Sequence, residues 1–170
     1  VGYTEMEKSS IPIKSNKIFA LSAIKHATRA LLQKGPKDEI SEEERDIALR
    51  FWTDINEQIS EWKLVQAKKL SVAEFRQEYI IAHGIGLQAL ANVGKELLEI
   101  PQTSRLNVIK KLRKIDWRKS NSEWARRAMQ HGRLSKASSN IFLTSIEVKR
   151  QLGLKLSAED QSKEQELLNL

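Results

Sequence analysis

Basic side chains are the residues of this chain whose number and spacing suit a particular chemistry, the binding of phosphate. The 32 residues from Arg105 to Lys136 hold eleven arginines and lysines against two acids, Asp116 and Glu123, which gives a net charge of +9. The rest of the chain holds 18 basic and 20 acidic residues, so this segment carries the whole excess of +7. Concentrated positive charge suits a polyanion, because contact with phosphates releases condensed counterions. The segment therefore predicts contact with nucleic acid; the alternative is a solvated face of two surface helices.

These basic residues could meet duplex DNA in two ways. Phosphate contacts need charge and reach, and they do not depend on the shape of a groove. A helix-turn-helix would instead make Arg126 and Arg127 the base readers, but the connection from Asp116 to Asn121 is longer than the usual turn and has no glycine. We therefore expect double-stranded DNA as the partner, mainly through its phosphates. The predicted contact residues are Arg105, Lys110, Lys111, Lys114, Arg118, Lys119, Arg126 and Arg127.

Side chains that could catalyse a reaction or hold a metal are few. The chain has no cysteine, which excludes a thiol nucleophile, a zinc–thiolate site and a disulfide framework. Its three histidines, His26, His83 and His131, are far apart, and none stands in a metal-binding pattern. We therefore expect no catalytic residue, no cofactor and no metal, and hence a protein that is not an enzyme. We interpret His83 as a core residue and His131, before Gly132, as the end of a helix.

Length and composition are those of one soluble domain. The chain has 170 residues, of which 40% are hydrophobic and 30% charged, enough to bury a core without disulfides. No apolar run approaches the roughly 18 residues that a membrane-spanning helix needs. These features, with the absence of cysteine, predict a cytoplasmic protein that does not contact a membrane. The chain begins with Val1, so we expect it to be part of a longer protein whose N-terminal part is missing.

Period-3.6 apolar patterns, each introduced by a capping residue, predict helices along the whole chain. The first is expected from Ser15 or Asn16 to about Gln33. The second follows a capping box formed by Ser41 and Glu44.

A long third helix is expected from Ser71 to about Leu98. The glycines inside it, Gly84, Gly86 and Gly94, predict that another backbone passes close by, or that the helix bends at residues 84–86. Shorter helices then start at Ser104, Ser120, Thr144 and Ser157.

The predicted fold class is all-α, a single compact domain of about six to eight helices. Residues 1–14 are expected to be an extension or linker, residues 15–156 the helical domain and residues 157–170 a C-terminal helix. Trp124 lies on the inward face of its predicted helix, and Trp117 follows Ile115 at the junction between two short helices. We therefore expect both to anchor the basic segment in the core.

Several short strings stand in this chain in the order in which one family has them. They are Ser15–Ile24, Trp52 with Trp62, Ala82–Gly84, Ile115–Trp117 followed by Asn121 and Trp124, Leu143–Thr144 and Leu152–Leu154. Over residues 14–156 the chain resembles the C-terminal half of the DndB family of DNA sulfur modification proteins, within the DGQHR-domain family. The resemblance implies a bacterial protein associated with DNA phosphorothioation, which binds DNA and represses the modification genes rather than transferring sulfur. The Asp-Gly-Gln-His-Arg string of the N-terminal half is absent, so we expect a C-terminal portion.

Charge and resemblance together predict a DNA-binding transcriptional repressor of a bacterial phosphorothioate modification gene cluster. Two alternatives stay open. The chain could be a protein-interaction or dimerisation module of the modification system, with the charge serving solubility, or the non-catalytic part of an enzyme whose active site lies in a missing N-terminal half. A homo-oligomer is compatible with each. The placement of the segment Arg105–Lys136, on one exposed face or scattered, bears on the first of these alternatives.

Overall fold

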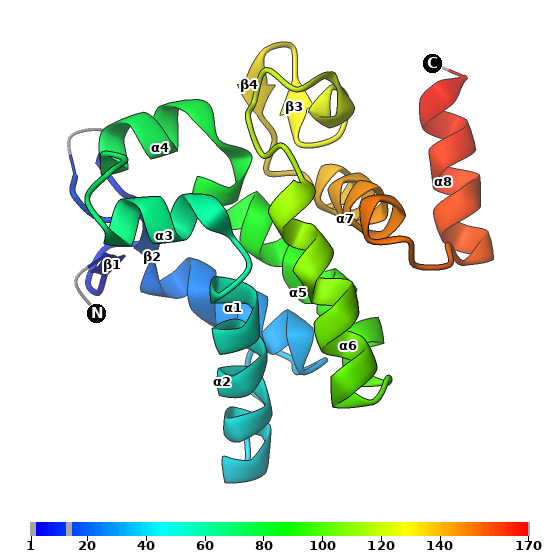
Figure 1. Ribbon diagram of the computed structural model, residues 1–170, viewed down its shortest axis with the longest axis horizontal. Helices are drawn as coiled ribbons and strands as arrows, with labels where there is room; N and C mark the ends of the chain where they lie inside the picture. The colour runs from blue at the N-terminus through cyan, green and yellow to red at the C-terminus, as the bar shows by residue number, and fades with distance from the viewer. Residues whose placement is uncertain (1–2, 13–14, 170) are drawn as a thin grey trace.

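Helix α5 (Gly84–Leu98) lies in the middle of the fold, and both α1 (Leu21–Leu31) and α7 (Ser138–Leu152) pack against it (Figure 1). The structure, a computed structural model, describes residues 3–12 and 15–169. The other elements are β1 (Thr4–Glu5), β2 (Phe19–Ala20), α2 (Glu42–Asn56), α3 (Ser60–Gln66), α4 (Val72–Glu78), η1 (Ile80–Ala82), α6 (Gln102–Ile109), η2 (Lys110–Lys114), η3 (Ser122–Trp124), β3 (Met129–Gln130), β4 (Arg133–Leu134) and α8 (Ala158–Leu168), where η marks a 3₁₀ helix.

Most of the surface of α5 is apolar, apart from a stripe that includes Gln88, Asn92 and Lys95, and this explains its central position. Leu90 and Val93 are at most 2% exposed, and a helix with so much apolar surface is stable only inside a protein. At Gly94 the neighbouring helices come very close: a Cβ there would lie 2.5 Å from Leu31 Cδ1 of α1 and 2.6 Å from Phe51 Cζ of α2. These neighbours are side chains; the close backbone that the glycines predicted is found at Gly86, where a Cβ would lie 2.9 Å from the Ile81 Cα.

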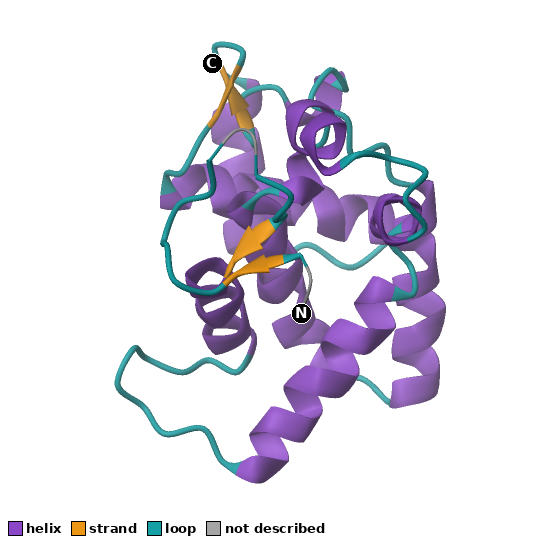
Figure 2. Cartoon of the chain, turned by 90° about the vertical axis from the view of Figure 1, so that its left-hand side faces the viewer, coloured by secondary structure: helices purple, strands orange, loops and turns teal. Residues whose placement is uncertain are grey.

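The prediction of an all-α single domain is confirmed. The described residues form eight α-helices, three short 3₁₀ helices and two pairs of strands, each strand only two residues long (Figure 2). Strand β1 pairs in parallel with β2, and β3 pairs antiparallel with β4. His131 and Gly132 form the β3–β4 turn with φ of 48° and 75°, as a two-residue hairpin requires. The helix end predicted at these two residues is therefore wrong.

Helix starts were predicted correctly where a side chain caps its own first turn. Ser41 and Glu44 form a reciprocal capping box at α2, and Ser157 and Asp160 form another at α8. The Ser71 side chain also accepts a hydrogen bond at the start of α4. These caps are local, so three or four adjacent residues are enough to predict them.

Four other predicted starts are wrong. Helix α6 begins earlier than the predicted Ser104, directly after Pro101. Helix α1 begins at Leu21, because the residues before it, Phe19 and Ala20, form strand β2 and pair with β1. The hydroxyl of Thr144 donates to the carbonyl of Asn140 at 2.7 Å inside α7, which begins earlier. At η3 the cap is Asn121, not Ser120. The incorrect starts are those at Ser15 or Asn16, Ser104, Ser120 and Thr144.

The predicted helix from Ser71 to Leu98 is three elements in the structure, α4, η1 and α5. The break occurs where a distant segment takes over the backbone hydrogen bonds. Tyr79 forms a β-bridge with Arg118, and the Ile80 amide donates to the Trp117 carbonyl at 2.9 Å. The prediction of one continuous helix is therefore wrong: the chain breaks at residues 79–83, before the bend expected at residues 84–86, and α5 runs unbroken from Gly84.

His83 lies partly buried at this break, where its Nε2 donates to the carbonyl of Arg76 at 2.7 Å. Burial lowers the pKa of His83 to about 4, although the hydrogen bond opposes this, and the charges of Lys119 and Arg76 lower it further. The unfolded chain therefore takes up a proton at higher pH than the folded protein does.

We expect the stability that neutral His83 supports to be fully present above pH 6.5 and to fall below it. The expected loss is roughly 1 kcal/mol per pH unit as the pH drops from 6.5 towards 4. His83→Gln should flatten this dependence between pH 6.5 and 5 in urea unfolding, while His26→Gln, at an exposed position, should not. An unchanged slope in the His83 variant would contradict this assignment.

Candidate nucleic-acid interface

The 3₁₀ helix η2 presents the densest run of basic side chains. Lys110, Arg113 and Lys114 are exposed on it, whereas Leu112 and Ile115 are at most 4% exposed and fix it to the core. Because a 3₁₀ helix has three residues per turn, Lys110 and Arg113 lie one above the other. Arg113 was missing from the predicted contact residues, although it belongs to the same run of charge.

Lys111 and Lys119, both predicted contact residues, are held by carbonyls at the ends of helices. Lys111 Nζ donates to the Leu152 carbonyl of α7 at 2.7 Å. Lys119 Nζ donates to the carbonyls of Arg76 and Gln77 in α4 at 2.7 and 2.8 Å. A cation there satisfies unpaired carbonyls and opposes the helix dipole. These two lysines therefore have structural roles that the charge pattern did not indicate.

Arg118 and Arg126 are exposed, as a contact residue must be. The Arg118 guanidinium lies 5.7 Å from the centre of the Tyr79 ring and 3.5 Å from Asp116 Oδ1. Arg126 adopts a positive φ of 60° just before the hairpin. Both side chains sit on connections between elements, not on a helix that could enter a groove.

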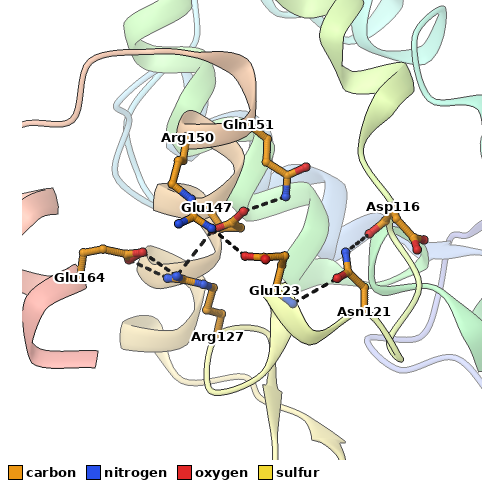
Figure 3. A network of polar contacts seen from close by, with 8 residues as sticks. All are labelled: Asp116, Asn121, Glu123, Arg127, Glu147, Arg150, Gln151 and Glu164. Atoms are coloured by element: carbon orange, nitrogen blue, oxygen red, sulfur yellow. Dashed lines mark hydrogen bonds and ion pairs between the residues drawn. The ribbon is translucent and has the colours of Figure 1, made fainter. Parts of the chain in front are cut away.

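Arg127 lies inside the protein, which corrects its predicted role as an exposed contact residue. It is 5% exposed, and its two terminal nitrogens donate to the carboxylate of Glu164 in α8 at 2.5 and 2.7 Å (Figure 3). Its Nη2 is also 3.5 Å from Glu147 Oε2 of α7. A buried cation must be paired in this way, so Arg127 joins the hairpin region to two helices and stabilises the fold.

Arg127 belongs to a larger set of charges that we name the Glu147 cluster: Glu123, Arg127, Glu147, Arg150 and Glu164 (Figure 3). Glu147, 1% exposed, is its centre. Arg150 Nη2 lies 2.8 Å from Glu147 Oε2 and 2.6 Å from Glu123 Oε2. Burial alone would lower the pKa of Arg150, but the hydrogen bond and charge of Glu147, with Glu123 adding, outweigh it and raise the pKa. The cluster thus favours the charged form of Arg150.

Arg105, the first of the predicted contact residues, lies half-buried in α6, the helix that leads into η2. It shares a surface hollow with Arg50 and Lys95 but also with Glu44 and Glu99. Charges of both signs therefore meet there, and the hollow has no clear preference for an anion.

Trp117 and Trp124 anchor the basic segment in the core, as predicted. Both are 0% exposed, and their rings stack in parallel with centres 5.5 Å apart. Trp124 Nε1 donates to the Asp116 carbonyl at 2.8 Å, and Asn121 Nδ2 donates to the same oxygen at 2.9 Å. The stretch between them is a loop followed by a three-residue 3₁₀ turn, so the structure excludes a helix-turn-helix here.

The exposed charge of residues 105–136 is therefore distributed over three parts of the molecule. These are η2, the loop that carries Arg118, and the hairpin region with Arg126, Arg133 and Lys136. Figure 1 shows the chain passing from α6 to the β3–β4 hairpin. The segment does not form two surface helices; along it, exposed basic residues alternate with buried anchors.

Residues 3–12 and 15–169 hold neither a metal-binding cluster nor a membrane-spanning helix. No three histidine, aspartate or glutamate side chains there come together in a way that could hold a metal ion. No helix in this part of the chain is long and apolar enough to cross a bilayer.

Comparison with known proteins identifies a family for the chain. The family model DndB, described as DNA-sulfur modification-associated, matches residues 1–155, which is most of the chain. No curated protein and no solved structure matches it. The match to the family model confirms the family resemblance that the short sequence strings indicated. The chain belongs to the DndB family of DNA-sulfur modification-associated proteins.

Proposed function

We propose that this chain is a DNA-binding repressor of a bacterial DNA phosphorothioate modification gene cluster, that it acts in the cytoplasm, and that it is not an enzyme. Membership of a DNA-sulfur modification-associated family supports the link to modified DNA. The observation that carries DNA binding is η2, where Lys110, Arg113 and Lys114 are exposed on one short, anchored element.

The surroundings of η2 favour binding to the DNA backbone. Leu112 and Ile115 are buried beneath it, so three long cationic side chains project from a base that is already ordered. Backbone phosphates accept such contacts whatever the base sequence. Selection of a particular operator requires additional contacts, for which the exposed Arg118 and Arg126 are the nearest candidates along the chain.

We expect binding to duplex DNA to weaken steeply with salt. About four to six phosphate contacts give a slope of roughly −4 to −5 in a plot of log affinity against log salt concentration. Replacing Lys110, Arg113 and Lys114 together with glutamine should weaken binding and flatten this slope by about one unit per lost contact. Fluorescence anisotropy with a labelled duplex measures both quantities.

The matched control replaces the exposed Lys37, Lys68 and Lys69 with glutamine, which removes the same charge from another part of the surface. An equal effect of the two triple variants would mean that net charge, not η2, determines binding. Affinity that does not change with salt would overturn the electrostatic interface altogether. A promoter fragment of the gene cluster that binds no better than unrelated DNA would count against the repressor role.

A further inference from the structure

A cavity of about 380 Å³ lies where β2, the start of α5 and the end of the hairpin meet. Three basic side chains from separate parts of the chain line it, Arg76, His83 and Lys136. No aspartate or glutamate is among its lining residues in the described part of the chain. The cavity shares no residue with η2, and its volume is within the range typical of small-molecule sites.

The two cations that line this cavity, Arg76 and Lys136, have no carboxylate beside them in the described part of the chain. Arg76 is half-buried, and its Nη1 donates to the carbonyl of Ile18 at 2.8 Å. Across residues 3–12 and 15–169, neither Arg76 nor Lys136 has a carboxylate within 4.0 Å. Burial lowers the pKa of Arg76. Desolvated cations are normally paired, so an anion in the cavity would supply what the chain lacks.

The start of α5 adds to the positive electrostatic potential at the cavity. His83 provides no side-chain cap there, and the first helical hydrogen bonds are those of the Gly86 and Leu87 amides to the His83 carbonyl. The amides of Gly84 and Ile85 precede them, and both residues line the cavity. Unpaired amides at the beginning of a helix favour an anion.

The rest of the lining is apolar and can accommodate a ring. Phe19, Ile85, Leu134 and Ile141 contribute to the wall, with Ser135 beside them. An inorganic anion would leave this apolar part in contact with water. A ligand that carries both a phosphate and a flat, weakly polar group fits the two halves together.

We propose that this cavity binds a nucleotide, with the phosphate at Arg76, Lys136 and the start of α5, and the base against the apolar wall. The phosphate can belong to a free nucleotide or to a nucleotide of DNA, because both present the same chemistry. The site is independent of the duplex-binding surface at η2.

The test is a titration of the full chain with deoxyadenosine monophosphate, inorganic phosphate and a short DNA duplex, followed by NMR of the His83 ring. A bound phosphate should raise the pKa of His83 from about 4, because a neighbouring anion favours the protonated ring. Lys136→Gln should weaken nucleotide binding about tenfold or more, the effect of losing one charge-assisted hydrogen bond. Arg133→Gln is the matched control, since Arg133 is exposed three residues earlier and does not line the cavity.

The outcomes are separable. The site is supported if nucleotide binding raises the His83 pKa, is lost in Lys136→Gln and is kept in Arg133→Gln. If only the duplex gives this pattern, the bound phosphate belongs to DNA. The proposed site is overturned if the His83 ring responds to neither the nucleotide nor the duplex. It is also overturned if Lys136→Gln and Arg133→Gln weaken nucleotide binding equally. Inorganic phosphate that binds as tightly as the nucleotide overturns the base-binding half. The η2 triple variant should still bind nucleotide, so failure of duplex binding at η2 leaves this result intact.

Discussion

Trp124→Ala is expected to lower the free energy of unfolding by about 3–5 kcal/mol, a large share of the 5–15 kcal/mol that usually stabilises a domain. The side chain is 0% exposed and stacks on Trp117. Its Nε1 also donates to the Asp116 carbonyl, so the substitution leaves a cavity and an unpaired acceptor together. Guanidinium unfolding followed by circular dichroism measures the loss.

A matched comparison is Trp52→Ala, because Trp52 is only half-buried and bonds to the Thr28 hydroxyl near the surface. We expect a smaller loss there. DNA binding by Trp124→Ala should fail only under conditions in which the protein unfolds. A variant that melts like the wild type but no longer binds DNA would make Trp124 a contact residue and contradict its assignment to the core.

Arg127→Met is expected to cost about 3–5 kcal/mol, the usual effect of removing one member of a buried ion pair. The substitution removes both short hydrogen bonds to Glu164 and leaves Glu147 with Arg150 as its remaining cation. The volume of methionine is close to that of the arginine stem, so the loss comes mainly from uncompensated charge. Thermal and chemical unfolding should report the same order of effect.

A double-mutant cycle tests this cause. Arg127→Met combined with Glu164→Met removes both charges, and well-packed apolar replacements of buried ion pairs are often close to neutral. The double variant should therefore be more stable than the sum of the two single losses predicts. Simple additivity would mean that Arg127 and Glu164 do not depend on each other.

Local signals predicted the helical class and several helix starts, because a cap such as Ser41 with Glu44 involves only adjacent residues. The break after α4 was not predicted in this form. Its cause is the segment around Trp117, which takes backbone hydrogen bonds from Ile80. Such a pairing depends on the three-dimensional arrangement and leaves no periodic pattern in the sequence.

The candidate interface, too, could be predicted only in part from the sequence. The run of charge correctly indicated that basic residues at η2 would be exposed, but every lysine and arginine gave the same signal. Arg127 differs from its neighbour Arg126 only because Glu164, 37 residues later, reaches it. Lys111 similarly meets a carbonyl 41 residues later. A charge count cannot distinguish a cation that caps a helix from one that faces solvent, because the difference arises from tertiary contacts.

Ion pairs join α8 to the rest of the protein, and this affects how DNA binding by shortened forms of the protein should be interpreted. Residues 157–170 hold four acids and one lysine, so their removal changes the net charge from +7 to +10. It also takes Glu164 away from Arg127 and Asp160 away from Lys149. A fragment restricted to the family-matched residues would therefore attract any polyanion more strongly. A stronger gel shift from such a fragment would reflect the missing acids, and it should not be mistaken for a gain in specificity.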